Sequence, residues 1–217
     1  MKKGFIFDLD GVIVDTAKYH YLAWKKLANE LGFVFTEEQN EMFKGVSRKR
    51  CLEILLDIGN RKATQKQFDT WMIKKNEDYL EYIANMDTSE ILPDVPRILN
   101  FLAQRNLPIA LGSASKNARP ILEKVGLLHY FKAIVDGNNV TKAKPDPEVF
   151  LLAAKELNVA AKDCVVFEDA LAGIKAANAA KMTSIGIGDE KVLNQANFNF
   201  KDFTEISTDF MTKLIEK

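Results

Sequence analysis

The sequence predicts an α/β fold in which a doubly wound parallel sheet carries an inserted α-helical domain. From about residue 89 onward, strand-like and helix-like segments alternate, which is typical of a parallel sheet covered by helices on both faces. Before that, one strand-like segment ends at Phe7, and residues 16–88 contain only helix-like segments. The simplest arrangement places the first strand in the later sheet. Residues 1–15 and 89–217 then form a core domain, and residues 16–88 form a helical cap domain.

The elements up to residue 88 follow from apolar spacing and from capping residues. The run Phe5–Phe7 is apolar and rich in β-formers, as in a buried strand. In the cap, the i, i+3, i+4, i+7 spacing of an amphipathic helix is formed by Trp24, Leu27, Ala28 and Leu31. Capping residues predict further helices that start at Thr36, Ser47 and Thr64.

The core elements are predicted in the same way. Strands are expected at 108–113, 133–135, 164–167 and 183–187. Helices are expected at 94–105, 118–125, 146–157 and 170–180. The residues after these elements are weakly patterned, and we predict no chemistry there.

Composition and charge argue against some classes of function. Lys plus Arg and Asp plus Glu both total 30, so the net charge of zero argues against nucleic-acid binding. No apolar run approaches the length of a membrane span, and aspartates interrupt the run that a secretory signal would need. Cys51 and Cys164 lie far apart, as expected of reduced thiols. We expect a cytoplasmic protein without nucleic-acid or membrane partners, and a monomer.

Two acidic pairs follow predicted strands. Asp8 and Asp10 share one face of the chain at the carboxyl end of the first strand, where ligands bind in open α/β sheets. Their mutual repulsion would be relieved by a divalent cation such as Mg²⁺, which prefers oxygen ligands. An acidic Asp-Gly turn is the alternative. Glu168 and Asp169 follow another strand, and although such a pair is often a surface turn, the two pairs together favour metal coordination.

Candidate anion-binding groups follow the strand at 108–113. Ser113, Ser115, Lys116 and Asn117 precede a helix, whose N-terminal amides favour an anion. N-capping by Ser115 is the ordinary alternative, but it leaves Ser113 and a lysine in the first turn unexplained. Lys144 precedes another helix start. A lone lysine there is usually solvated, but near a carboxylate and a phosphoryl group it would balance charge.

The cap carries a basic cluster, Lys44–Arg50, at a predicted helix start. The helix dipole disfavours cations there unless an anion is bound, and a solvated run of charges is the alternative. A phosphate-bearing substrate between this loop and Ser115–Asn117 would account for both clusters. His20 and Trp24 lie one helical turn apart. Trp24 is expected in the cap core, and His20 belongs either to the surface or to the closed site.

These motifs together resemble the four motifs of the haloacid dehalogenase superfamily of phosphotransferases. They occur in the expected order along essentially the whole chain, as Asp8-Leu9-Asp10-Gly11-Val12, Ser113, Lys144 and Glu168-Asp169. The resemblance implies a Rossmann-like core and identifies the helical insertion as the small helical cap of that superfamily.

A narrower set of residues resembles the β-phosphoglucomutases within that superfamily. It comprises Asp15-Thr16, His20, Trp24, Lys44-Gly45-Val46-Ser47-Arg48 and Ser113-Ala114-Ser115-Lys116-Asn117, with Lys75-Asn76 as a less distinctive match. Two positions depart from the pattern: Gly112 replaces an expected alanine, and Ala170 replaces an expected serine. Neither departure removes a reactive group, but the second removes a hydroxyl beside the acidic pair.

The resemblance implies a role for each of these residues. Asp8 would be the nucleophile that forms an aspartyl phosphate, and Asp10 the general acid and base. Mg²⁺ would be held by Asp8, Glu168, Asp169 and the backbone carbonyl of Asp10. Ser113 and Lys144 would stabilise the transferring phosphoryl group. A phosphorylated hexose would have its distal phosphate bound by Arg48, Ser115, Lys116 and Asn117. The rest of the substrate site would be formed by Asp10, Trp24, Lys44, Gly45 and Val46.

The implied reaction moves a phosphoryl group between the 1- and 6-oxygens of glucose through β-glucose 1,6-bisphosphate, under a closed cap that excludes water. A sugar-phosphate phosphatase of the same superfamily is the nearest alternative, because only the cap loop and Ser115–Asn117 distinguish the two. A receiver-type signalling domain would need neither a helical insertion nor Asp10. A dehalogenase would need no metal-binding acidic pair.

Overall fold

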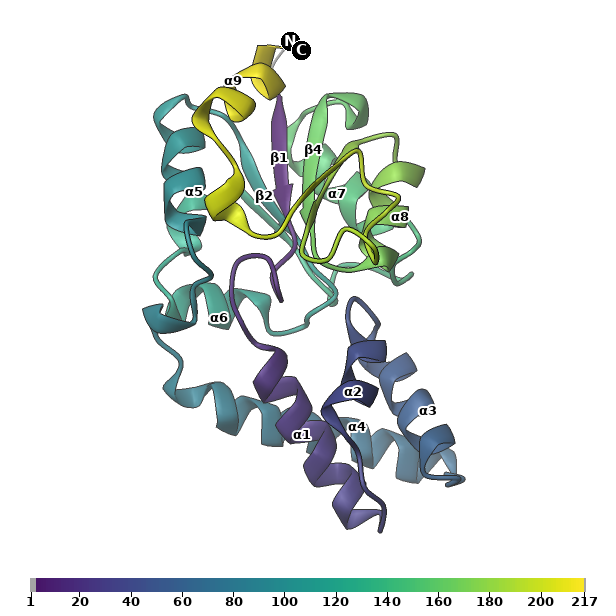
Figure 1. The fold of residues 1–217 in the computed structure, drawn as a ribbon. Coiled ribbons are helices and arrows are strands. Elements are labelled where there is room, and N and C mark those ends of the chain that lie inside the picture. The colour runs from purple at the N-terminus through teal and green to yellow at the C-terminus, as the bar shows by residue number, and fades with distance from the viewer. Residues whose placement is uncertain (1–2, 217) are drawn as a thin grey trace.

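The computed structural model describes residues 3–216 and shows a parallel sheet with a group of helices beyond one of its ends (Figure 1). The domain limits predicted at residues 1 and 217 lie outside the described residues. Both ends of the chain lie at the edge of the sheet that faces away from these helices. The opposite side of the sheet, where the carboxyl ends of the strands lie, faces these helices. A site between the two parts would therefore lie at the carboxyl ends of the strands.

The sheet has six parallel strands in the order β3-β2-β1-β4-β5-β6. They are β1 (Gly4–Phe7), β2 (Ile109–Gly112), β3 (Ala133–Val135), β4 (Cys164–Glu168), β5 (Thr183–Ile187) and β6 (Phe198–Phe200). Phe5 pairs with Ile109 on one side and with Val165 on the other, so β1 is central. The strand order reverses beside β1, which makes its carboxyl end the expected ligand site. The predicted doubly wound sheet is confirmed.

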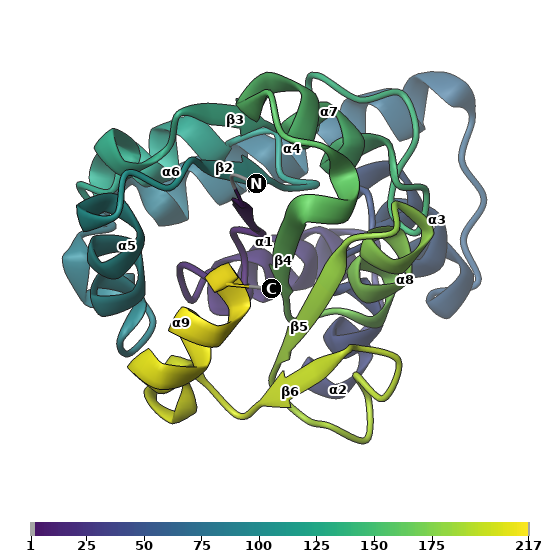
Figure 2. The ribbon, with the colours of Figure 1, turned by 90° about the horizontal axis from the view of Figure 1, so that it is seen from above.

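Helices cover both faces of the sheet because alternate strand residues point to opposite sides. Phe5 and Phe7 belong to the apolar cluster with α5 (Val95–Gln104), α6 (Ala118–Lys124) and α9 (Thr208–Glu216). Ile6 belongs to the other cluster, with α7 (Glu148–Leu157) and α8 (Leu171–Ala179). Figure 2 shows α5 and α9 on one side of the sheet and α7 and α8 on the other. Among residues 3–216, no helix is both long and apolar enough to cross a membrane.

Four helices form the cap: α1 (Ala17–Glu30), α2 (Glu37–Asn40), α3 (Arg48–Ile58) and α4 (Gln65–Tyr82). They enclose their own apolar cluster, which includes Trp24, Phe35 and Leu55. Two chain segments connect this unit to the sheet, and they pair with each other where the Asp15 N–H donates to the Glu90 carbonyl at 2.9 Å. The separate apolar cluster and the paired connections support our proposal that residues 16–88 form a distinct cap domain.

Two elements near the C-terminus are absent from the sequence prediction. The strand β6 has three half-buried residues at the edge of the sheet, so it lacks the apolar run of a central strand. The helix α9 packs against the sheet cluster through Met211 and Leu214. The segment that precedes β6 also contributes residues to the cavity described below.

Candidate active site

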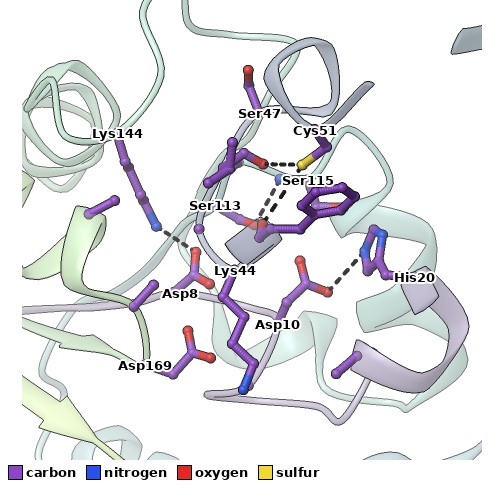
Figure 3. Close-up of a pocket in the computed structure, with 18 of the residues that line it drawn as sticks. Asp8, Asp10, His20, Lys44, Ser47, Cys51, Ser113, Ser115, Lys144 and Asp169 are labelled. Carbon is purple, nitrogen blue, oxygen red and sulfur yellow. Dashed lines mark hydrogen bonds and ion pairs between the residues drawn. The ribbon is translucent and has the colours of Figure 1, made fainter. Parts of the chain in front are cut away.

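A cavity of about 870 Å³ lies between the carboxyl edge of the sheet and the cap (Figure 3). It brings together residues that the sequence predicts from both domains. The sheet domain contributes Asp8, Asp10, Ser113, Ser115, Lys116, Lys144 and Asp169, and the cap contributes His20, Trp24, Lys44, Gly45, Val46 and Arg48. Two predicted site residues do not line the cavity: Glu168 is fully buried below it, and Asn117 is 9% exposed.

The sheet wall of the cavity contains a buried cluster of charges. Asp8 follows β1, and its backbone N–H donates to the Phe167 carbonyl of β4 at 3.0 Å. Lys144 donates to Asp8 Oδ1 at 2.7 Å and to Glu168 Oε1 at 2.6 Å, and its side chain is 1% exposed. Although burial lowers the pKa of Lys144, the two carboxylates raise it above its usual value. The lysine is therefore charged and holds Asp8 in one orientation.

Three carboxylates at this wall fit a metal ion. Asp8, Glu168 and Asp169 each offer an oxygen, and the three oxygens lie within 4.8 Å of one another. Burial, with the neighbouring acids, raises the pKa of Asp169 well above its usual value, so its ionised form is disfavoured there unless a cation is bound. Asp169 can lie this close to the chain after β1 because residue 11 is a glycine. Gly11 has φ +76°, and a Cβ there would lie 2.1 Å from Asp169 Oδ2. Hard oxygen donors of this kind suit Mg²⁺.

Asp10 lies in the same cavity, two residues beyond Asp8, and is held from the cap side. Thr16 donates a hydrogen bond to Asp10 Oδ1, and His20 Nε2 lies 3.8 Å from the same oxygen. Burial and the Asp8 carboxylate raise the pKa of Asp10 to about 6. A carboxyl group with a pKa near neutrality can both donate and accept a proton, so the geometry suits a general acid and base.

A buried lysine adjoins His20 at the cap side of the cavity. Lys75 Nζ lies 3.0 Å from His20 Nδ1 and stands over the rings of Trp24 and Tyr79 at 4.7 and 4.8 Å. Burial and the Arg48 charge lower the pKa of Lys75 to about 7. Burial and Lys75 lower the pKa of His20 well below its usual value, so His20 is neutral. Its Nδ1 then accepts from Lys75, and its Nε2–H faces Asp10.

The loop after β2, residues 113–117, forms another part of the wall. Ser113 is fully buried, and its backbone N–H donates to the Val135 carbonyl at 3.0 Å. Within the loop, Ser115 N–H donates to Ser113 Oγ at 3.1 Å and Asn117 N–H donates to Ser115 Oγ at 3.2 Å. Each serine thus stabilises the turn. Lys116 is exposed at the cavity, where its ammonium can bind an anion.

The cap loop Lys44–Arg48 faces the sheet across the cavity. Ser47 caps α3 by accepting from the Arg50 N–H at 3.4 Å, so Arg48 falls in the first helical turn as predicted. Arg48 is half-buried, and none of the described residues forms a salt bridge with it. Gly45 has φ +68°, and a Cβ there would lie 2.7 Å from the Cβ of Ala170. The cap loop therefore contacts the segment that follows the acidic pair.

Some residues of the cavity were not predicted from the sequence. Cys51 lies under the cap loop, where its Sγ contacts the Val46 carbonyl at 3.6 Å. Burial raises the pKa of Cys51 to about 12, so it is an inert wall residue, as its interpretation as a reduced thiol implies. A further part of the wall comes from the region after β5 and includes Asp189, Val192, Lys201 and Asp202. No local sequence pattern identifies these residues, because the order of the strands in the sheet, and not their neighbours in sequence, brings them to the cavity.

The fold and the site define a class of protein. The family model of haloacid dehalogenase-like hydrolases matches residues 2–181, and the chain therefore belongs to this family. The resemblance predicted from the motifs is confirmed at this level.

Known proteins similar to this chain include both mutases and phosphatases. A β-phosphoglucomutase from Bacillus subtilis (strain 168) is 39% identical over 211 residues, which are 96% of this chain and 93% of that protein. The fructose-1-phosphate phosphatase YqaB from Escherichia coli (strain K12) is 32% identical over 85% of this chain and 95% of that protein. The crystal structure of a β-phosphoglucomutase from Clostridium difficile superimposes with a TM-score of 0.94 at 38% identity, and it covers 100% of this chain and 98% of that one.

Proposed function

We propose that the protein is a β-phosphoglucomutase that interconverts β-D-glucose 1-phosphate and D-glucose 6-phosphate. The observation that carries this proposal is the cavity with groups for phosphate on both walls. Asp8 and Lys144 lie on the sheet wall, and Lys44, Arg48 and Lys116 line the same cavity from the cap and from the loop after β2. A mutase needs a second phosphate site, because its intermediate carries two phosphates.

In the first half of the reaction, a carboxylate oxygen of Asp8 attacks the phosphorus of a bisphosphate. The bond from phosphorus to the sugar oxygen breaks, an aspartyl phosphate forms, and Asp10 gives its proton to the departing oxygen. Lys144 and Ser113 stabilise negative charge on the transferring group. The raised pKa of Asp10, about 6, makes it an adequate acid near neutrality.

In the second half, glucose 6-phosphate has left, and the 6-hydroxyl of a β-glucose 1-phosphate that has taken its place attacks the phosphorus of the aspartyl phosphate, which regenerates the bisphosphate. Asp10 accepts the hydroxyl proton and Asp8 leaves as a carboxylate. Arg48, Ser115 and Lys116 hold the phosphate that does not react, so the same groups serve whichever phosphate faces Asp8. Trp24, Gly45 and Val46 form the wall for the sugar. Water must be excluded at this stage because it would hydrolyse the aspartyl phosphate.

Mg²⁺ is the proposed cofactor, held by Asp8, Glu168, Asp169 and the Asp10 carbonyl. When bound, it would neutralise the excess negative charge of the carboxylates and of the phosphoryl oxygens. The cluster of three carboxylates with a single paired lysine supports this assignment.

We also propose a monomeric enzyme of the cytoplasm. Support for the first part is that residues of one chain supply both walls of the cavity. Support for the second is that Cys51 and Cys164 are both free and buried, as expected in a reducing compartment.

A sugar-phosphate phosphatase is the second candidate, because the phosphatase YqaB shares 32% identity with this chain. Phosphorus NMR separates the two. The protein is incubated with Mg²⁺ and β-glucose 1-phosphate, with a trace of β-glucose 1,6-bisphosphate to start the reaction. We expect glucose 6-phosphate as the main product. Inorganic phosphate as the main product would show that the protein is a phosphatase and not a mutase.

A further inference from the structure

A hydrogen bond between two asparagines joins the cap to the core beside the loop 113–117. Asn117 Nδ2 donates to Asn76 Oδ1 at 3.0 Å. Asn76 is half-buried on α4 of the cap, and Asn117 precedes α6 of the core. The two residues are 41 positions apart in sequence, and they meet only because α4 lies against this edge of the core.

The side chain of Asn117 is turned away from its own helix. An asparagine in this position ordinarily accepts a hydrogen bond from the first turn of the helix that follows. Asn117 makes no such capping bond, and its amide points to Asn76 instead. The direction of the Asn117 amide is therefore set by the cap and not by the helix that follows it.

This direction matters for an anion in the cavity. A side-chain amide carries two N–H donors, and Asn76 accepts from one of them. The second donor remains available, and Ser115 and Lys116, which precede Asn117 in the same loop, line the cavity. Asn117 itself does not line the cavity, but its backbone N–H donates to Ser115 Oγ at 3.2 Å, so the bond to Asn76 anchors the loop that does line it.

We propose that Asn76 is a positioning residue for the phosphate site: it acts through Asn117 and makes phosphate binding depend on the position of the cap. The inference deepens the proposed function and rests on it for the sugar-phosphate substrate. A second contact between the same parts of the molecule serves as a control. Lys124 Nζ donates to the Ala84 carbonyl at 2.6 Å, and this bond joins α6 to the end of the cap without contacting the loop 113–117.

The test compares Asn76→Ala, Asn117→Ala, the double variant and Lys124→Ala. Two reactions are measured: turnover of β-glucose 1-phosphate, and phosphorylation of the protein by acetyl phosphate, which has no distal phosphate. Loss of one hydrogen bond to an orienting partner should raise the KM for the sugar phosphate about fivefold in Asn76→Ala, with little change in kcat. The acetyl phosphate reaction should be unchanged, and the double variant should match Asn117→Ala alone.

Three results would overturn the proposal: additive effects in the double variant, an equal loss with acetyl phosphate, or the same rise in KM for Lys124→Ala. Asn76→Ser, which is too short to reach Asn117, repeats the test if the alanine variant is unstable. If the wild-type protein releases phosphate instead of forming glucose 6-phosphate, the proposed mutase reaction fails. The same variants are then compared by phosphate release, so the inference about Asn76 is judged separately.

Discussion

The two walls of the cavity are positioned in different ways. On the sheet wall, Asp8 and Ser113 each follow a strand and Glu168 ends one, so backbone hydrogen bonds between neighbouring strands determine their spacing. On the cap wall, Arg48 lies at the start of a helix that belongs to the other domain, and Gly45 touches Ala170 across the cavity. Secondary structure positions the first wall, and contact between domains positions the second.

The two walls also differ in charge. On the sheet wall, Lys144 is paired with two carboxylates, and the third carboxylate, Asp169, adds negative charge. On the cap wall, no described residue forms a salt bridge with Arg48, and the Arg48 charge, after burial, lowers the pKa of the nearby Lys75. A metal ion would balance the first wall and an anion the second. This difference suits a phosphorylated substrate that bridges them.

The largest expected effect comes from the sheet wall. Asp8→Asn keeps the shape of the side chain but removes the nucleophile, so phosphoryl transfer should fall by at least about a thousandfold. Turnover of β-glucose 1-phosphate and labelling of the protein by a phosphoryl donor measure this loss. Asp57→Asn, on an exposed part of α3, is the matched control and should be unchanged. Turnover retained in Asp8→Asn would exclude this residue as the nucleophile.

Arg48→Ala tests the cap wall. A charge-assisted hydrogen bond to phosphate is lost, so the KM for the sugar phosphate should rise by about tenfold to a hundredfold. Phosphorylation by acetyl phosphate should change much less. The neighbouring Arg50 is exposed and paired with Glu53 at 3.0 Å, so Arg50→Ala should leave both reactions nearly unchanged. Equal losses on both phosphoryl donors in Arg48→Ala would show that this arginine does not bind the distal phosphate.

Gly45→Ala tests the contact between the walls. Its Cβ would lie 2.7 Å from the Cβ of Ala170, at a φ of +68° that disfavours alanine. The cap loop must move, and sugar-phosphate turnover should fall by roughly tenfold, since about 1–2 kcal/mol of backbone strain is added to the steric conflict. Gly126→Ala has nearly the same backbone angle, φ +72°, with no atom within 4 Å of the new Cβ, and should reduce stability alone. Equal losses of turnover in the two variants would contradict a specific role for the Gly45 contact.

The prediction for Lys75 concerns the stability of the protein and not its reaction. Its pKa is about 7 in the folded protein and 10.5 when exposed, so between these values unfolding takes up a proton. The free energy of unfolding should therefore rise with pH above 7, by up to about 1.4 kcal/mol per pH unit for this group. Urea denaturation at pH 7, 8 and 9 measures the slope, which should be shallower in Lys75→Met. Identical slopes in the two proteins would mean that Lys75 is charged in the cap.

Local patterns in the sequence were sufficient to predict which residues lie together on the sheet wall. Asp8 and Glu168 lie at the ends of apolar runs, and the carboxyl ends of parallel strands meet at one edge of the sheet, so their proximity could be predicted. Helix caps at Ser47 and Thr64 were predicted for the same reason, because a cap involves residues only three positions apart. The strand β6 was missed because its three half-buried residues form no distinct apolar run.

Only the tertiary structure decided the contacts between distant segments. Lys75 meets His20 across 55 positions and Asn117 meets Asn76 across 41, and neither pair leaves a periodic signal in the sequence. The same is true of the cavity wall after β5. The sequence by itself determined which groups stand at the strand ends and helix starts, because short-range hydrogen bonds and alternation position them. The burial that lowers the pKa of Lys75 depends on how the cap helices pack together, and the orientation of Asn117 depends on how the cap meets the core.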